Sequence, residues 1–401
     1  MKELLAPAGD MECVEAAMRY GADAIYLGGP QMQLRADKAG FDMQGLTKAL
    51  ELVHSYGKKA YVTVNCFAKN SEIESVSDYA RQLHEIGVDA AIVSDIGVLA
   101  AVKRAVPDLE VHISTQANCQ NYSAARVYYD MGASRVVLGR EMTLDEIAEL
   151  RAKTPKDLTI EAFVHGAMCM SYSGRCLISS YLNNRSGNRG ECTQPCRWKY
   201  YLVEEKRPGV YLPVIEDEAG TAVLSSHDMC CIDFIDKIAE AGVESFKIEG
   251  RMKTAYYVAT VVNAYRRRLD GTSTAEYCRE ELECVTHRPY STGFYYGYEK
   301  KNPNNHGEYI RNCTFVGTVL ESGDGYLTVQ QRNNFKVGQT LELLTPGREA
   351  YSFTLSEIID ENGEKLEAAP HPMMKVKIPC GIDANPGDIL RRKESGFYEQ
   401  N

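Results

Sequence analysis

The stretch ELLAPAGDMECVEAAMRYGADAIYLGG, residues 3–29, shows the unit from which most of this chain is built. The apolar runs Glu3–Ala6 and Ala24–Leu27 predict strands, and Met11–Tyr20 between them has helical periodicity. Both runs are apolar without strict alternation, as in parallel strands that are buried on both faces. The glycine of GAD (21–23) stands where the helix gives way to the second strand, a position that favours the left-handed conformation. The stretch therefore predicts a strand–helix–strand unit of a parallel sheet.

The same unit recurs along the chain. The phrases GVD (87–89), GAS (132–134) and GVE (242–244) precede strands in the way that GAD does. Eight such strands, separated by helical segments, predict an α/β fold, a (β/α)8 TIM-like barrel. A doubly wound open sheet is the alternative, but no Gly-x-Gly-x-x-Gly follows the first strand. The further predicted strands are Ala60–Asn65, Ala90–Val93, Val111–Ser114, Arg135–Leu138, Thr159–Val164 and Ser245–Ile248.

Polar side chains gather where these strands end, and in such barrels the chemistry takes place at the C-terminal ends of the strands. Three of these side chains, Arg140, Lys247 and Arg251, are cations and suit a ligand that carries carboxylate or phosphate groups. The alternative is that they form ion pairs with Glu141, Glu161 and Glu249 that hold the rim together. The candidates for substrate binding are Asn65, Gln116, Arg140, Lys247 and Arg251. The candidates for proton transfer are His165 and Glu161, with Asp228 from a later segment.

The C-terminal part of the chain has a different pattern. Short alternating runs such as FVGTVLES (315–322), YLTVQQR (326–332) and MMKVKIP (373–379) are separated by turn residues. This pattern predicts a small all-β barrel domain, of a kind that commonly binds RNA or a partner protein. We therefore expect a barrel domain over residues 1–275 with an insertion at 166–230, a linker at 276–308 and the β domain at 309–401.

The overall composition is that of a globular protein without a membrane segment. No apolar run approaches the roughly 20 residues of a membrane span, and the start MKELLAPAGD lacks the apolar region of a signal peptide. We therefore expect a cytoplasmic protein, in which the thirteen cysteines are not disulfide-bonded. The net charge of −10 argues against a globally basic nucleic-acid binder but allows a local basic groove.

Six of the thirteen cysteines fall between Cys169 and Cys231, in an insertion after the seventh predicted strand. The segment is rich in Gly, Ser, Asn and Arg, and a metal centre is one way to order so loop-rich a segment. Structural zinc favours paired Cys-x(2–4)-Cys knuckles, of which Cys192-x3-Cys196 is at most one half. A redox dithiol of the Cys-x-x-Cys type is absent. An iron–sulfur cluster tolerates uneven spacing, so the spacing leaves a cluster, zinc and unliganded thiols open.

Long motifs in this chain resemble those of the collagenase-like peptidase family (family U32). They are EAFVHGAMCMSYSGRCLIS (161–179), ELLAPAGD (3–10), HISTQANCQN (112–121), RVVLGRE (135–141) and SFKIEGRMKTAYYVATVVNAYR (245–266). The resemblance covers nearly the whole chain and implies a barrel with a 4Fe–4S cluster. Matched residue by residue, it implies the ligands Cys169, Cys176, Cys192 and Cys230, with Cys196 or Cys231 as alternatives for one of them.

Within this family the chain is most similar to members that hydroxylate RNA, through the phrase GECTQPCRWKY (190–200) and the appended β domain. This resemblance implies oxygen-independent conversion of the tRNA wobble uridine to 5-hydroxyuridine, with prephenate as the source of the hydroxyl group. The implied partners are a tRNA anticodon loop, a prephenate-like carboxylate bound by the rim cations, and an electron donor or a family partner subunit. Trp198, Tyr200 and Tyr201 are candidates to stack on the base.

Other functions remain open at this stage. A related branch hydroxylates an intermediate of quinone biosynthesis, and another RNA base is a further substrate to consider. A peptidase would need an activated cysteine or serine, or a metal motif. His165 precedes Cys169 by four residues, but neither His-Glu-x-x-His nor Gly-x-Ser-x-Gly occurs. A non-catalytic RNA-binding scaffold with a structural cluster is the alternative outside enzymes.

Overall fold

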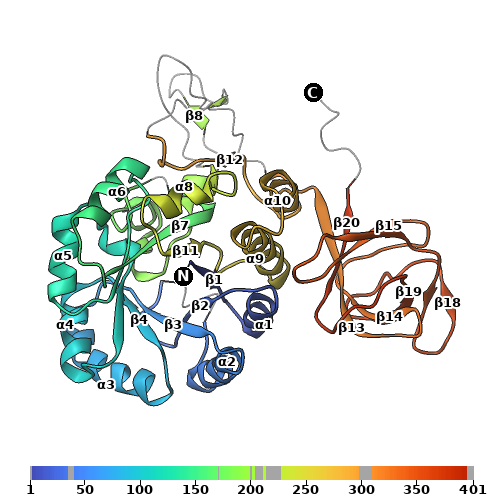
Figure 1. The fold of residues 1–401 in the computed structure, drawn as a ribbon, viewed down its shortest axis with the longest axis horizontal. Helices are drawn as coiled ribbons and strands as arrows, with labels where there is room; N and C mark the ends of the chain where they lie inside the picture. Colours follow the sequence, from blue (N-terminus) through green and yellow to red (C-terminus); the bar gives the residue numbers. More distant parts are fainter. Residues whose placement is uncertain are drawn as a thin grey trace. The chain divides into compact units, whose positions relative to one another are not determined.

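The computed structural model describes residues 2–34, 40–169, 171–198, 201–203, 211–213, 227–297 and 309–394 (Figure 1). By their contacts the residues divide into two compact units. The first comprises Met1–Met18, Ala22–Lys253 and His287–Tyr309, and the second comprises Arg19–Gly21, Thr254–Thr286 and Ile310–Asn401. No helix in the described part of the chain is long and apolar enough to cross a membrane.

The first unit is built on a closed barrel of eight parallel strands. Each strand pairs with the next along the chain, and the last of them, β11, pairs with both β7 and β1, which closes the ring. The predicted TIM-like barrel is therefore confirmed, and the open sheet is excluded. The barrel strands are β1 (Glu3–Pro7), β2 (Ala24–Gly28), β3 (Lys59–Val64), β4 (Ala90–Val93), β5 (Glu110–Ile113), β6 (Arg135–Val137), β7 (Thr159–Ala167) and β11 (Ser245–Ile248).

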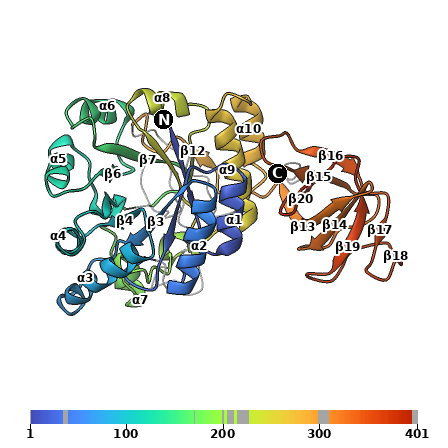
Figure 2. The same ribbon diagram turned by 60° about the horizontal axis from the view of Figure 1, so that its bottom comes forward.

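Helices lie outside the barrel strands, with their apolar sides buried (Figures 1 and 2). Because the strands are covered by helices outside and by side chains inside, nearly all their residues are buried, as the unbroken apolar runs predicted. The glycines 21, 87, 132 and 242, which end helices before strands, have φ between 85° and 99°. This left-handed backbone confirms the predicted reason for glycine there. The helices are α1 (Met11–Arg19), α2 (Met43–Ser55), α3 (Asn70–Glu85), α4 (Ile96–Ala105), α5 (Tyr122–Asp130), α6 (Leu144–Ala152) and α8 (Ile235–Glu240).

The cysteine-rich insertion separates β7 from β11, as expected. It contains the short helix α7 (Ile178–Asn183), single 3-10 turns, the pair β8 (Tyr201–Val203) and β9 (Tyr211–Pro213), and β10 (Asp228–Cys230). Strand β10 runs antiparallel to β7, with Cys230 opposite His165, and β12 (Tyr290–Ser291) pairs with β10 on its other side. Strand β7 thus continues beyond the barrel into a small extension of the sheet.

The second unit contains two helices, α9 (Ala255–Leu269) and α10 (Ala275–Leu282), and an antiparallel sheet of eight strands. Among the described residues no pairing joins its two outer strands, so the sheet is a half-barrel. In this unit the sulfur atoms of Cys284 and Cys313 lie 2.7 Å apart, and both side chains are buried. In spatial order the strands are β16 (Tyr351–Thr354), β15 (Thr340–Leu344), β20 (Ile389–Lys393), β13 (Cys313–Gly323), β14 (Tyr326–Gln331), β19 (Lys375–Pro379), β17 (Ile358–Ile359) and β18 (Lys365–Leu366).

The division by contacts differs from the boundaries expected from the sequence. Helix α9 follows the eighth barrel strand, yet it groups with the C-terminal strands. The expected linker, residues 276–308, contains most of α10 together with β12, and its residues 298–308 lie outside the described part of the chain. The Pro, Gly and Asn residues of this stretch are typical of a linker. They give no local sign of its two short elements, α10 and β12, which are ordered by contacts with distant parts of the chain.

Candidate functional site

The cysteine insertion lies over the ends of the barrel strands and is held there by charged contacts. Arg189 binds the Glu72 carboxylate at 2.6 Å and 3.0 Å and donates to the carbonyl oxygen of Phe67 at 2.7 Å. Hydrogen bonds from Arg189 hold the pKa of Glu72 at about 2. The backbone N–H of Ser173 donates to Glu141 at 2.9 Å. Because Phe67 follows β3 and Glu141 follows β6, these contacts fix the insertion to the C-terminal face of the barrel.

A close backbone contact adds to this attachment. Gly174 has φ +71°, and a Cβ atom at this position would stand 2.0 Å from the carbonyl oxygen of Gln116. Gln116 itself lies in a 3-10 turn (Thr115–Ala117) after β5 and is half-buried. Only glycine permits both this backbone conformation and this approach.

Two of the three predicted cations, Arg140 and Arg251, follow the ends of β6 and β11. Arg140 forms an ion pair with Glu249 at 2.8 Å, donates to the carbonyl oxygen of Ala167 at 2.6 Å and lies over the ring of Phe163. Arg251 donates to the hydroxyl of Thr63 at 2.7 Å and to the side-chain oxygen of Gln33. Both guanidinium groups are thus held at the rim by partners within the protein. The pairing of Arg140 with Glu249 matches the second interpretation of the sequence, in which ion pairs with glutamates hold the rim together.

Asn65 follows β3 at the same face. Its amide nitrogen lies 3.4 Å from the Ser114 hydroxyl, and its backbone carbonyl accepts from Ser94. Within the described residues its buried Oδ1 atom has no hydrogen-bond partner. An unsatisfied buried acceptor destabilises a fold by about 1–3 kcal/mol, so Asn65 stands out among the rim residues.

The structure places Glu161 and Lys247 differently from the sequence expectation. Both are buried inside the barrel, where Lys247 binds Glu161 at 2.7 Å and Arg135 binds its other oxygen at 2.9 Å. Glu161 lies opposite Ser245, the first residue of β11, which is also opposite Glu3 at the start of β1. Glu161 is therefore level with the beginnings of strands and not with the rim, and Lys247 reaches it inside the barrel. The strand was predicted to end at Val164, but β7 continues to Ala167, so its C-terminal end lies six residues beyond Glu161.

The buried ion pairs decide the charge of Glu161. Burial by itself raises the pKa of this carboxyl, but the charges of Lys247 and Arg135 outweigh burial and lower the pKa to about 2. Glu161 is therefore ionised and compensated on both oxygens. This arrangement favours a structural role in the barrel interior over proton transfer.

The other two candidates for proton transfer lie on adjacent strands. His165 is buried on β7, and its ring lies 5.5 Å from that of Tyr290, which in turn stacks on His287 at 4.0 Å. Burial, and then the nearby charges of His287 and Lys253, lower the pKa of His165 to about 3, so its ring is neutral near pH 7.

Asp228 on β10 is bound by Arg288. The Nε and Nη2 atoms of Arg288 donate to Oδ1 of Asp228 at 3.0 Å and 2.7 Å, and both side chains are buried. A carboxylate held in this way favours a structural role. Sequence reasoning missed Arg288, His287 and Tyr290, because the phrase HRPY stood in the expected linker. Its close grouping of a histidine, an arginine and a tyrosine was the available signal.

The cysteines divide clearly by exposure. Nine of the thirteen are buried, and the other four all lie in the insertion: Cys169, Cys176, Cys192 and Cys196. Cys230, the fourth ligand implied by the resemblance, is buried on β10 and opposite His165. Cys231 beside it is fully buried, which raises its pKa well above the ordinary value.

The segments that carry Cys176 and Cys192 are joined by hydrogen bonds. The Ser179 and Thr193 hydroxyls lie 3.2 Å apart, and Asn188 donates to the carbonyl oxygen of Cys176. The sulfur of Cys192 also accepts from a backbone N–H at 3.4 Å, as cluster ligands do. The donor set therefore suits iron–sulfur chemistry. In the described part of the chain, however, no three His, Cys, Asp or Glu side chains converge as metal ligands, and the cluster stays a prediction.

Of the three aromatic candidates for base stacking, Trp198 is half exposed. Tyr200 lies outside the described residues, and for Tyr201 only the backbone is described.

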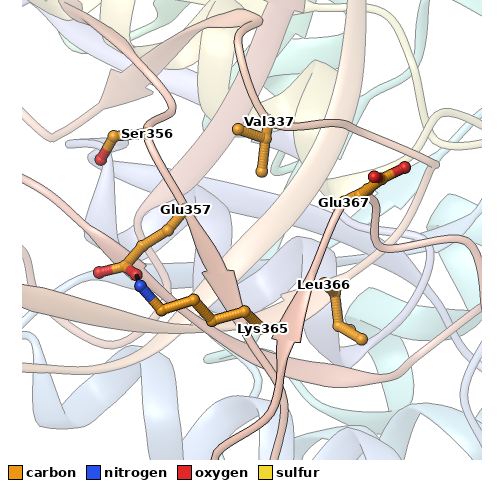
Figure 3. Close-up of a pocket in the computed structure, with 6 residues that line it drawn as sticks. All are labelled: Val337, Ser356, Glu357, Lys365, Leu366 and Glu367. Atoms are coloured by element: carbon orange, nitrogen blue, oxygen red, sulfur yellow. Dashed lines mark ion pairs between the residues drawn. The ribbon is translucent and has the colours of Figure 1, made fainter.

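A hollow on the second unit is a poor alternative site for RNA. Its Glu357 and Lys365 form an ion pair at 2.8 Å (Figure 3). The Tyr326 hydroxyl also donates to Glu357 at 2.9 Å. Two carboxylates and one ammonium group give it a negative balance, opposite to what phosphate groups require. It is lined by Val337, Ser356, Glu357, Lys365, Leu366 and Glu367.

Comparison with known proteins identifies the family. The family model "Peptidase family U32" matches residues 9–305, and "Peptidase family U32 C-terminal domain" matches residues 311–391. The chain belongs to peptidase family U32. The family resemblance inferred from the motifs is thereby confirmed for both parts of the chain.

Its relatives carry names of two kinds. "tRNA hydroxylation protein P1" of Bacillus subtilis (strain 168) is 38% identical over 97% of this chain and 94% of that protein. "23S rRNA 5-hydroxycytidine C2501 synthase" of Escherichia coli (strain K12) is 38% identical over 67% of this chain and 39% of that protein. "Collagenase" of Porphyromonas gingivalis is 33% identical over 74% of this chain and 73% of that protein.

Proposed function

We propose that this protein hydroxylates a base of RNA, and specifically that it converts the wobble uridine of tRNA to 5-hydroxyuridine. The observation that carries the proposal is the similarity to tRNA hydroxylation protein P1, which extends over 97% of this chain. Another relative is named for forming 5-hydroxycytidine in ribosomal RNA, so the names of relatives include hydroxylation of both tRNA and ribosomal RNA. Replacing hydrogen by hydroxyl at C5 removes two electrons from the base, so the reaction needs a hydroxyl donor and an electron acceptor.

The candidate site is the C-terminal face of the barrel beneath the insertion. Asn65 and Gln116 offer side-chain amides there, and amides can pair with the polar edges of bases. A base can reach this face only when it is unstacked, as in a single-stranded anticodon loop. Near neutral pH the neutral ring of His165 can donate or accept a hydrogen bond to the substrate, whereas Glu161 and Asp228 are committed to ion pairs.

The proposed cofactor is a 4Fe–4S cluster held by Cys169, Cys176, Cys192 and Cys230. When bound, such a cluster supplies electron transfer. The donor chemistry supports it, because the non-buried thiols of the chain are confined to the insertion. Cys196 is the alternative fourth ligand, since it is accessible and Cys230 is buried. Anaerobic purification should give about four irons per chain, and iron should be lost in Cys169→Ala. A colourless protein that contains zinc would contradict the cluster.

Prephenate is the proposed source of the hydroxyl group. Of the expected cations, Arg140 and Arg251 remain candidates for its carboxylates because they lie at the rim, whereas Lys247 is paired with Glu161 inside the barrel. A host that cannot make prephenate should lose the modification and regain it when prephenate is restored. Persistence of the modification without prephenate would exclude this donor. An electron carrier that takes up the two electrons removed from the base, or a family partner subunit, would complete the system, in the place where the sequence resemblance implied an electron donor.

The central experiment is nucleoside analysis of tRNA by mass spectrometry. A strain that lacks this gene should lose 5-hydroxyuridine and its derivatives, and the wild-type gene should restore them. Unchanged wobble hydroxylation would refute the uridine assignment. Loss of a hydroxylated base from ribosomal RNA, or accumulation of a quinone precursor, would identify one of the alternative substrates.

Peptidase activity is the second candidate because the family name and the Porphyromonas gingivalis relative point to it. The purified protein should leave gelatin and collagen peptides intact. Cleavage that disappears in Cys169→Ala would support the peptidase. If the deletion strain keeps all its hydroxylated nucleosides and the purified protein cleaves no peptide, the non-catalytic RNA-binding scaffold is the remaining interpretation.

A further inference from the structure

Helix α7 in the insertion has its polar side facing inward. Ser179 and Asn183, one helical turn apart, both bind Thr193: the two hydroxyls lie 3.2 Å apart, and the Asn183 amide donates at 2.8 Å. The backbone N–H of Thr193 returns a bond to Ser179 at 3.1 Å. The inner face of α7 is thus a hydrogen-bonded contact, and Ile178 is the one apolar residue of the helix that is partly buried.

The outer face of α7 carries the apolar side chains. Leu177 and Tyr181 are also one turn apart, and their side chains are 68% and 87% exposed. Leu182 is 49% exposed, and two aromatic residues elsewhere in the insertion, Tyr172 and Trp198, are 52% and 50% exposed. A surface helix normally buries its apolar side and exposes its polar side. This reversed arrangement indicates a surface that is covered by a binding partner.

The charge of the same segment indicates what kind of partner fits. Residues 166–198 contain four arginines and one glutamate, a net charge of +3 in a chain whose net charge is −10, and one of these arginines, Arg189, is balanced by Glu72 of the barrel. Arg175 and Arg185, on either side of α7, are exposed. Aromatic side chains flanked by arginines are the combination that binds single-stranded nucleic acid, through base stacking and phosphate contacts.

We infer that α7 and its flanking residues form a stacking surface for single-stranded RNA, which we call the α7 surface: Tyr172, Leu177, Tyr181 and Trp198, with Arg175 and Arg185. This inference rests on the proposed function and adds the part of the protein that holds the RNA. The contacts of Arg189 with Glu72 and of Ser173 with Glu141 fix the insertion to the barrel face. RNA bound on the α7 surface would therefore be presented to that face from a fixed position.

The test is RNA binding by the full-length protein, measured by fluorescence anisotropy with a labelled anticodon stem–loop. Tyr181→Ala should raise the Kd roughly 5- to 150-fold, the range expected for loss of one stacked base. Tyr181→Phe keeps the ring and should stay within about twofold of wild type. Tyr56→Ala is the matched control for Tyr172→Ala, because both tyrosines are 52% exposed and Tyr56 stands at the end of α2, where the chain enters β3.

The outcomes separate this inference from the proposed function. If wild type binds the stem–loop and Tyr181→Ala and Tyr172→Ala bind it equally well, the α7 surface is wrong while RNA hydroxylation stands. If wild type neither binds RNA nor restores tRNA hydroxylation, the proposed function itself fails. A change in oligomeric state of Tyr181→Ala by light scattering, with unchanged RNA binding, would assign the α7 surface to a second copy of the chain and overturn the inference.

Discussion

Replacing Gly174 by alanine tests how the insertion is attached to the barrel. Gly174 has φ +71°, and an L side chain in this backbone region costs about 1–2 kcal/mol. The added Cβ would also lie 2.0 Å from the carbonyl oxygen of Gln116, whereas real Cβ atoms essentially never come within 3.0 Å of such an atom. The two backbones must therefore separate by at least the difference, about 1 Å.

A separation of this size strains the neighbouring bond from Ser173 to Glu141, which is 2.9 Å long. A hydrogen bond to a charged group contributes about 1.5–3 kcal/mol. The total cost of Gly174→Ala is therefore roughly 2.5–5 kcal/mol, concentrated in the insertion. Gly57→Ala is the matched control, because Gly57 has φ +66° and its Cβ would meet nothing within 4 Å. The control should cost only the conformational part, about 1–2 kcal/mol.

Hydrogen–deuterium exchange followed by mass spectrometry distinguishes the two variants. In Gly174→Ala, peptides from residues 168–198 should exchange faster than in wild type, because this segment detaches from the barrel face. In Gly57→Ala the same peptides should exchange at the wild-type rate. Equal exchange of these peptides in both variants would refute the argument that the close contact at Gln116 holds the insertion in place.

Three further predictions concern buried groups. Lys247→Met leaves the Glu161 charge without one partner and should lower the free energy of unfolding in urea by about 3–5 kcal/mol. Lys153→Met, at an exposed ion pair, should leave the free energy of unfolding nearly unchanged. The pKa of Glu161 is lowered from 4.5 to about 2, so its stabilising effect is full above pH 4.5 and is lost as the pH falls toward 2; Glu161→Gln should flatten this acid dependence. Cys284 and Cys313, with sulfur atoms 2.7 Å apart, should yield one linked peptide on treatment with a disulfide oxidant.

Each of these has a result that contradicts it. Equal losses in Lys247→Met and Lys153→Met would show that the buried pair contributes no more than a surface pair. An unchanged slope of stability against pH between 4.5 and 2 in Glu161→Gln would mean that other carboxyls dominate acid unfolding. Recovery of Cys284 and Cys313 as two separately alkylated peptides after oxidation would rule out their pairing.

The barrel could be predicted from the sequence because its signals are local. Buried parallel strands are continuous apolar runs, and each helix-ending glycine announces the next strand within a few residues. The positions of individual site residues depend on strand length and on partners far along the chain. Glu161 was misplaced because nothing local shows that β7 continues to Ala167 beyond its predicted end at Val164. Arg288 was missed because its partner, Asp228, lies 60 positions earlier.

The cysteine insertion was recognised as a site but not as a structure. Its composition predicted loops, and its family motifs predicted a ligand set, but its attachment through Arg189 and Glu72 joins residues 117 positions apart. No periodicity in the sequence encodes such a pair. The inverted helix α7 was also invisible, because a six-residue helix is too short for a hydrophobic period to be read.

The pairing of β10 with β12 has a consequence for the order of events during synthesis. The strand that carries Cys230 lies between β7 and β12, and Asp228 on it is held by Arg288. Closure of the ring itself requires β11 to meet β1, which is 242 positions earlier. All six cysteines of the insertion therefore leave the ribosome before the barrel can close and before β12 can pair with β10, the strand that carries Cys230. The nascent chain thus carries these thiols into the cell unshielded, and any metal loading that needs the assembled face must wait until about residue 290 has emerged.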